Sequence, residues 1–133
     1  MEIKKIILAS LSSTILMLQT NVASALDIKA GPIWNNADAA TKCPMATQHY
    51  GGWTGNWKTI KPGVMSVCET VEESITSDEY AIQAGPIWNN QDAVNKCSSA
   101  TQHYGGWTGN WTTIIAGKMS VCETHQKVIT EYH

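Results

Sequence analysis

The stretch Ala-Thr-Gln-His-Tyr-Gly-Gly-Trp-Thr-Gly-Asn-Trp occupies residues 46–57 and returns without change at residues 100–111. The similarity extends outward from this stretch, because 32 of the 41 positions in 30–70 are identical to those in 84–124. A repeat of this length indicates a duplicated structural unit. The sequence therefore predicts two tandem modules, residues 26–77 and 78–133, and each is close to the lower size limit for independent folding.

Each repeat predicts an α+β module in which one helix packs on a small antiparallel β-sheet. In the first module we expect an extended segment, a helix and the two strands of a hairpin at residues 27–30, 37–50, 53–60 and 64–75. Asn36 is the expected N-cap of the helix, and Gly51-Gly52 is the expected stop. Pro44 lies inside the helix and lacks an N–H, so it is expected either to kink the helix or to start a second one.

Four cysteines, two in each repeat, predict two disulfides formed in an oxidising compartment. Four cysteines allow three pairings. Duplication of one stable unit favours Cys43 with Cys68 and Cys97 with Cys122, one disulfide per module. The cysteines do not occur at the short spacing of a zinc site. We therefore predict no metal and no cofactor.

The first 25 residues have the pattern of a secretory signal peptide. A basic start at residues 1–5 precedes an apolar run at 6–18, and Ala23-Ser24-Ala25 offers small residues for cleavage. The apolar run is too short for a spanning helix of about 20 residues. The prediction is a secreted or periplasmic protein that does not insert into a membrane after cleavage.

Charge excludes some partners of the mature chain. Beyond residue 25 the sequence has 7 Lys and 10 Asp and Glu, and it contains no Arg. Nucleic-acid binding normally needs a basic patch, and Arg is the residue best suited to phosphate. We therefore expect no nucleic-acid partner and no anionic membrane surface, and a neutral ligand fits best.

Three motifs occur in the same order in both repeats. In the first repeat they are Gly-Pro-Ile-Trp-Asn-Asn at 31–36, Trp-Thr-Gly-Asn-Trp-Lys-Thr at 53–59 and Met-Ser-Val at 65–67. Together they resemble the mannan-binding lectin family of cyanobacteria. The resemblance implies recognition of the mannose-GlcNAc core of N-linked glycans near the junction of the modules, and a homodimer. Many such relatives carry a second disulfide per unit, where this chain has Thr47 and Thr70.

The chemistry of the motif residues suits a sugar. A sugar ring has an apolar face, which a flat aromatic ring can cover, and hydroxyl groups, which planar amides can bind as donor and acceptor. We predict two sites per chain that bind oligosaccharides or glycoproteins. The candidate carbohydrate-binding residues are Trp34, Asn35, Asn36, Asn56, Trp57 and Thr59, with Trp88, Asn89, Asn90, Asn110, Trp111 and Thr113.

Structural roles compete with these assignments. Trp34 and Trp88 could instead close the end of the core, and Trp53 is expected in the core. One of Asn35 and Asn36 is expected to cap the helix. His49 and its equivalent His103 are expected to interact with the helix dipole or a carbonyl.

Two other functions stay open at this point. One is weak hydrolysis of GlcNAc oligosaccharides, which usually needs two carboxylates. Within the first repeat only Asp38 and Glu69 are available. Relatives can carry an acidic residue directly after the Trp-x-Asn triplet, where this chain has Ala37 and Gln91, so we predict no catalytic residues. The other alternative is a secreted protein-interaction module.

Overall fold

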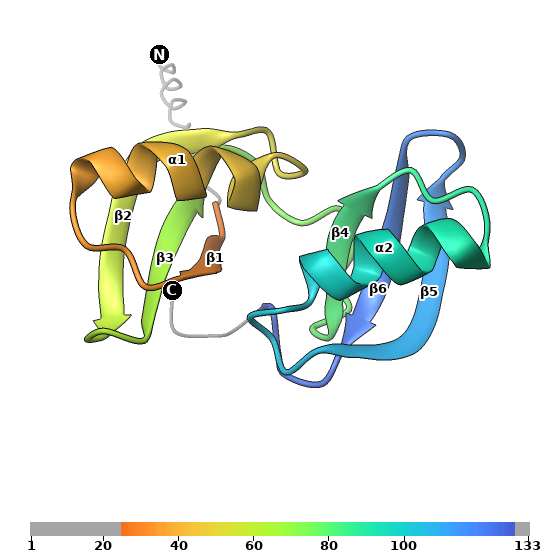
Figure 1. Ribbon diagram of the computed structural model, residues 1–133. Helices are drawn as coiled ribbons and strands as arrows, with labels where there is room; N and C mark the ends of the chain where they lie inside the picture. The colour runs from red at the N-terminus through yellow and green to blue at the C-terminus, as the bar shows by residue number, and fades with distance from the viewer. Residues whose placement is uncertain (1–24, 130–133) are drawn as a thin grey trace, which may run out of the picture.

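The computed structural model describes residues 25–129 as two modules that lie next to each other (Figure 1). The predicted signal peptide lies, apart from Ala25, outside the described residues. The elements of the first module are β1 (Asp27–Gly31), α1 (Asn36–Thr47), β2 (Trp53–Lys61) and β3 (Met65–Thr70). Those of the second module are β4 (Ala81–Gly85), α2 (Asn90–Ala100), β5 (Trp107–Ile115) and β6 (Met119–Thr124).

Each module consists of one helix on a three-stranded antiparallel sheet, which confirms the predicted α+β class. The strand orders are β1-β3-β2 and β4-β6-β5, so the last strand of each module is central. Cys68 in β3 pairs with Ile28 on one side and with Trp57 on the other. Because directly paired residues point to the same face of a sheet, these three side chains share the face that α1 covers.

The two predicted disulfides are confirmed, Cys43 with Cys68 and Cys97 with Cys122. Each joins the helix to the central strand, and all four cysteines are fully buried. Thr47 and Thr70 are also fully buried. The Thr47 hydroxyl donates to the carbonyl oxygen of Cys43 over 2.7 Å, and that of Thr70 donates to Glu72 O over 2.8 Å. Hydrogen bonds therefore satisfy these hydroxyls within the core.

The start of the helix corrects one prediction. The N-cap is Asn35 and not Asn36, and its side chain accepts the N–H of Asp38 over 2.8 Å. The helix is also shorter at its end, because it stops at Thr47, and Pro44 does not divide it. Pro44 and Ala40 are both exposed, so water can hydrate the carbonyl that a proline leaves unpaired. Strand β3 ends at Thr70, whereas its predicted end was residue 75.

The modules are joined by reciprocal tyrosine contacts. The hydroxyl of Tyr50 accepts the backbone N–H of Gln83 over 2.9 Å, and that of Tyr104 accepts the N–H of Lys29 over 2.8 Å. Both tyrosines belong to one apolar cluster that contains residues of both modules. Burial raises the pKa of Tyr50 to about 12. The core of the second module therefore continues into the first.

Substitution of Tyr50 by Phe should lower the free energy of unfolding by about 1–3 kcal/mol, because the N–H of Gln83 then stays buried without its acceptor. Urea unfolding followed by tryptophan fluorescence measures this loss. The control is Tyr80→Phe, because the Tyr80 side chain is exposed and surface changes usually stay within about 0.5 kcal/mol. Equal stability of the two variants would show that the hydrogen bond to Gln83 contributes nothing.

Two histidines also meet the opposite module. A Cβ on Gly85 would lie 2.7 Å from Cε1 of His49, and one on Gly31 would lie 3.0 Å from Cε1 of His103. Both glycines have a positive φ. Each histidine ring thus packs where the other module has no side chain, a contact that the sequence does not predict.

Stability should fall as the pH drops from about 7 to 5, a range above the usual titration of carboxylates. Burial, and then Lys96, lowers the pKa of His49; burial, followed by Lys42 and Lys29, lowers that of His103. A histidine with a pKa lowered in the folded state binds its proton more readily when unfolded. The stability that such a histidine contributes is thus fully present above about pH 6.5, the pKa of histidine in the unfolded chain. It is lost as the pH falls below that value.

Urea midpoints measured between pH 7.5 and 5 test this dependence. In a His49→Gln, His103→Gln double variant the slope over this range should be clearly smaller. The control is His125→Gln, which should keep the slope of the unmodified protein. A slope that is equal in all three proteins would contradict the assignment.

Candidate functional site

The most exposed aromatic side chains of the described residues lie just before each helix. Trp34 and Trp88 are 67% and 66% exposed, so neither closes the core. The ring atom Cη2 of Trp34 lies 3.7 Å from the position that a Cβ on Gly63 would take. The indole thus lies beside the turn between β2 and β3, and most of its surface is open to a ligand.

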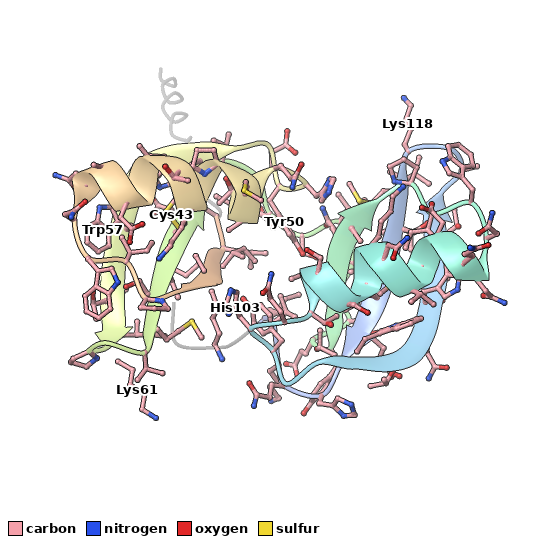
Figure 2. All side chains as sticks on the ribbon, in the orientation of Figure 1. Cys43, Tyr50, Trp57, Lys61, His103 and Lys118 are labelled. Carbon is pink, nitrogen blue, oxygen red and sulfur yellow. A yellow bond between two sulfur atoms is a disulfide. The ribbon has the colours of Figure 1, made fainter. Side chains whose placement is uncertain are left out.

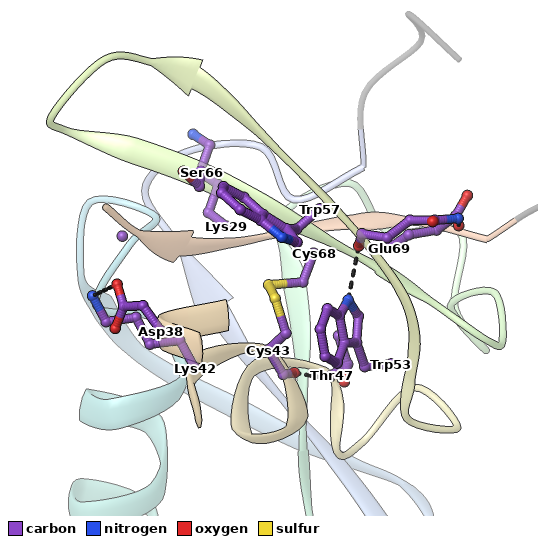
Figure 3. Close-up of a disulfide and its surroundings, with 12 residues drawn as sticks. Lys29, Asp38, Lys42, Cys43, Thr47, Trp53, Trp57, Ser66, Cys68 and Glu69 are labelled. Carbon is purple, nitrogen blue, oxygen red and sulfur yellow. Dashed lines mark hydrogen bonds and ion pairs between the residues drawn. A yellow bond between two sulfur atoms is a disulfide. The ribbon is translucent and has the colours of Figure 1, made fainter. Parts of the chain in front are cut away.

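A second tryptophan is fixed by an asparagine of the same motif. The indole Nε1 of Trp57 donates to Oδ1 of Asn36 over 2.9 Å. Trp57 is half-buried and packs with the cluster that contains Cys43 and Cys68 (Figure 3). Because the amide oxygen of Asn36 holds the indole, its NH2 group remains as the donor that can bind a hydroxyl.

The loop that carries Trp34 is held by Asp38. Oδ2 of Asp38 accepts the N–H of Trp34 over 3.1 Å and lies 3.1 Å from Nζ of Lys42. The hydrogen bond to Trp34, followed by that to Lys42, lowers the pKa of Asp38. In the second module Lys96, followed by the N–H of Trp88, lowers the pKa of Asp92.

These carboxylates suit a structural role. A general acid in glycoside hydrolysis needs a raised pKa, so that it carries a proton near neutral pH. The pKa values of Asp38 and Asp92 are instead lowered, so both carboxylates are ionised and paired with a lysine. They therefore lack the proton that a general acid must supply. Their geometry orients the exposed indoles of the two modules.

The amide of Asn56 lies elsewhere. Nδ2 of Asn56 and Oγ1 of Thr54 donate to Oε1 of Glu69 over 2.8 and 2.9 Å. The bond from Asn56, followed by that from Thr54, lowers the pKa of Glu69. Neighbouring residues of a strand point to opposite faces, so Asn56 lies on the face of the sheet opposite Trp57. Figure 3 shows Glu69 directed away from the disulfide.

Asn56 and Glu69 line a shallow hollow of about 170 Å³, and Asp27 and Lys58 are also among its lining residues. At the positions of Asp27 and Lys58 the second module has Ala81 and Thr112. The two modules therefore differ in charge on this outer face of the sheet.

The structure thus gives the candidate residues of each module different roles. Near the start of the helix, Trp34 is held by Asp38, and the indole of Trp57 is held by Asn36. Thr59 faces the same side of the sheet, where its hydroxyl lies 3.1 Å from that of the buried Ser66. Asn35 serves as the helix cap, and Asn56 binds a carboxylate on the other face.

The second module repeats this arrangement. Trp111 donates to Asn90 over 2.9 Å, and Asn89 caps α2 through Asp92 over 2.8 Å. The remaining two candidates keep their partners, Asn110 with Glu123 over 2.7 Å and Thr113 with Ser120 over 3.0 Å.

From the sequence, Glu69 was a candidate only for a catalytic carboxylate. The hydrogen bonds that Glu69 and Glu123 accept from Asn56 and Asn110 were not predicted. Across residues 25–129 no group of three or more His, Cys, Asp or Glu is arranged to hold a metal ion. No helix in this part of the chain is long and apolar enough to cross a membrane.

Comparison with known proteins gives two matches. A family model described as mannan-binding protein matches residues 36–70 and 90–124. Lectin MVL of Microcystis viridis is 38% identical over 104 residues, which cover 74% of this chain and 91% of that lectin. The two ranges of the family model extend from the start of the helix to the end of the last strand in each module.

Proposed function

The chain belongs to the mannan-binding protein family, a family of lectins and not of enzymes, and from this premise we propose that it is an exported lectin with two oligosaccharide sites. The ligands are oligosaccharides that contain mannose and GlcNAc, such as the core of N-linked glycans. Each module provides one site, at the start of its helix.

The observation that carries this proposal is an exposed indole two residues before an asparagine whose amide is held in place. The ring of Trp34 offers a flat apolar surface to the C–H face of a sugar. The NH2 group of Asn36, held in place through Trp57, can donate to a hydroxyl at the rim of the same sugar. Because the hydrogen bonds from Trp88 N–H to Asp92 and from Trp111 to Asn90 repeat those of the first module, we assign two sites to one chain.

Calorimetric titration with a soluble oligosaccharide of the N-glycan core should give about two molecules bound per chain. The control ligand is a glucose oligosaccharide of equal length, for which we expect no measurable heat. Two sites on one chain can act together on a branched glycan, and avidity then exceeds single-site affinity by about 10²–10⁴. A stoichiometry of one would instead indicate a single site shared by the two modules.

A further inference from the structure

A cavity lies between the modules, and its lining does not include the exposed tryptophans. Its volume is about 580 Å³, within the range of small-molecule sites. Most of its lining residues form pairs 54 positions apart, one from each module. Lys42 and Lys96 are such a pair, and so are His49 and His103. Figure 2 shows His103 at this junction of the modules.

Apolar side chains from both modules form part of the lining of the cleft. Ile28 and Ile82 line it, together with the paired alanines Ala46 and Ala100. No aromatic ring other than the two histidines and no Asp or Glu is found among its described lining residues. The cleft therefore lacks the indole surface that the proposed sugar sites have. Its apolar side chains are suited to contact the methylene groups of a ligand.

Two lysines, one from each module, also line the cleft. Nζ of Lys42 donates to the carbonyl oxygen of Pro32 and lies 3.1 Å from Asp38. Nζ of Lys96 makes the same two contacts with Pro86 and Asp92, again at 3.1 Å from the carboxylate. An ammonium group has three donors, so each lysine is held in position and keeps one N–H for a ligand.

The lysines act on the interior of the cleft. Lys96 contributes to lowering the pKa of His49, and Lys42 contributes to lowering that of His103, in both cases after burial. Lys29 adds to the effect at His103. No carboxylate is among the causes of either shift. Each half-buried ring is therefore influenced by a lysine of the other module.

We propose that the cleft between the modules binds a linear organic dianion with an aliphatic middle, an α,ω-dicarboxylate. One carboxylate binds Lys42 and the other binds Lys96, while the methylene groups lie on Ile28, Ile82 and the two alanines. The pairing of the lysines across the modules favours two anionic ends over one. The lining of this cleft contains none of the exposed tryptophans of the proposed sugar sites, although its lysines pair with the aspartates that hold the tryptophan loops.

Calorimetry with succinate, adipate, suberate and sebacate tests the proposal on the full mature chain. We expect one chain length to bind at least tenfold more tightly than the monocarboxylate with the same number of carbons. The diol of that length should not bind measurably. Equal affinity for all lengths, or for inorganic sulfate, would overturn the proposal because it would indicate attraction of any anion.

Lysine variants locate the two carboxylates. Lys42→Gln and Lys96→Gln should each reduce the affinity for the best dicarboxylate at least tenfold, to the level of the monocarboxylate. The matched control is Lys118→Gln, which lies at an outer end of the second module (Figure 2) and should leave the affinity unchanged. Unchanged affinity in both cleft variants would refute the assignment.

A third variant fills the cleft without a change of charge. Ala46→Leu with Ala100→Leu should abolish dicarboxylate binding, whereas Ala46→Ser with Ala100→Ser should retain it. Thermal unfolding of both proteins establishes that they fold. If the leucine variant does not fold, the lysine variants still test the proposal. The side chains of Lys42 and Lys96 are partly exposed, so their substitution should not prevent folding.

Discussion

Replacement of both Trp34 and Trp88 by alanine should abolish oligosaccharide binding, with a loss of about 100-fold or more in affinity at each site. Tryptophans that dominate a binding site commonly contribute more than 2 kcal/mol, and about 2.7 kcal/mol corresponds to 100-fold. The free energy of unfolding should change by less than about 0.5 kcal/mol, because both rings are mostly exposed. Calorimetry and urea unfolding measure the two quantities.

The single variants show whether the sites are independent. Trp34→Ala should leave about one oligosaccharide per chain, and Trp88→Ala should leave the other. The control is Tyr80→Ala, which removes an exposed ring outside the three motifs and should bind as the unmodified chain does. Full binding by the double tryptophan variant would place the sugar sites elsewhere.

Removal of the disulfide between Cys97 and Cys122 by alanine substitution should lower the free energy of unfolding by about 3–4 kcal/mol. The loop-entropy model gives this value for a closed loop of 25 residues. Both cysteines also belong to the apolar cluster that includes Ile28 and Tyr50 of the first module, so the first module should lose stability in the same transition. Urea unfolding followed by tryptophan fluorescence measures the loss.

The matched variant is the same substitution at Cys43 and Cys68, whose cluster contains only residues of the first module. Its loss should be similar in size, but the second module should unfold in a separate transition. A loss below about 1 kcal/mol in either variant would be incompatible with a structural role of the disulfide.

Local signals explain why most of the fold could be predicted. Gly51-Gly52 follows the end of the helix at Thr47 by a few residues, and the hairpin has Pro62 and Gly63 at its turn. Such signals lie close to the element that they delimit. The cysteine pairing followed from the repeat itself. The N-cap was misplaced by one residue because Asn35 and Asn36 are equally good caps, and only the backbone shows that Asn35 is extended.

The contact between the modules could not be predicted in this way. Tyr50 meets Gln83 and Tyr104 meets Lys29, at sequence separations of 33 and 75 residues. A repeat shows that two units exist, but it carries no signal for the faces that meet. The cleft with its lysine pair depends on that contact and was therefore missed as well.

The candidate site was predicted in part. The sequence left open whether Trp34 is exposed, since a tryptophan in a short chain can serve the core or a ligand equally well. Asn56 and Trp57 are neighbours in a motif, yet strand alternation places them on opposite faces. The partner of Asn56 is Glu69, 13 residues away, and this pairing depends on the register of the hairpin.

The reciprocal tyrosines have a consequence for how the protein behaves on dilution. Tyr50 and Tyr104 are equivalent residues, and each binds the backbone of the other module at equivalent positions. A chain with one module could complete these contacts only with a second copy, so its folding would depend on concentration. In the tandem chain the partner module is covalently attached. The two modules therefore associate within one molecule, and this association does not depend on concentration. The tandem chain therefore keeps its two halves together at any concentration.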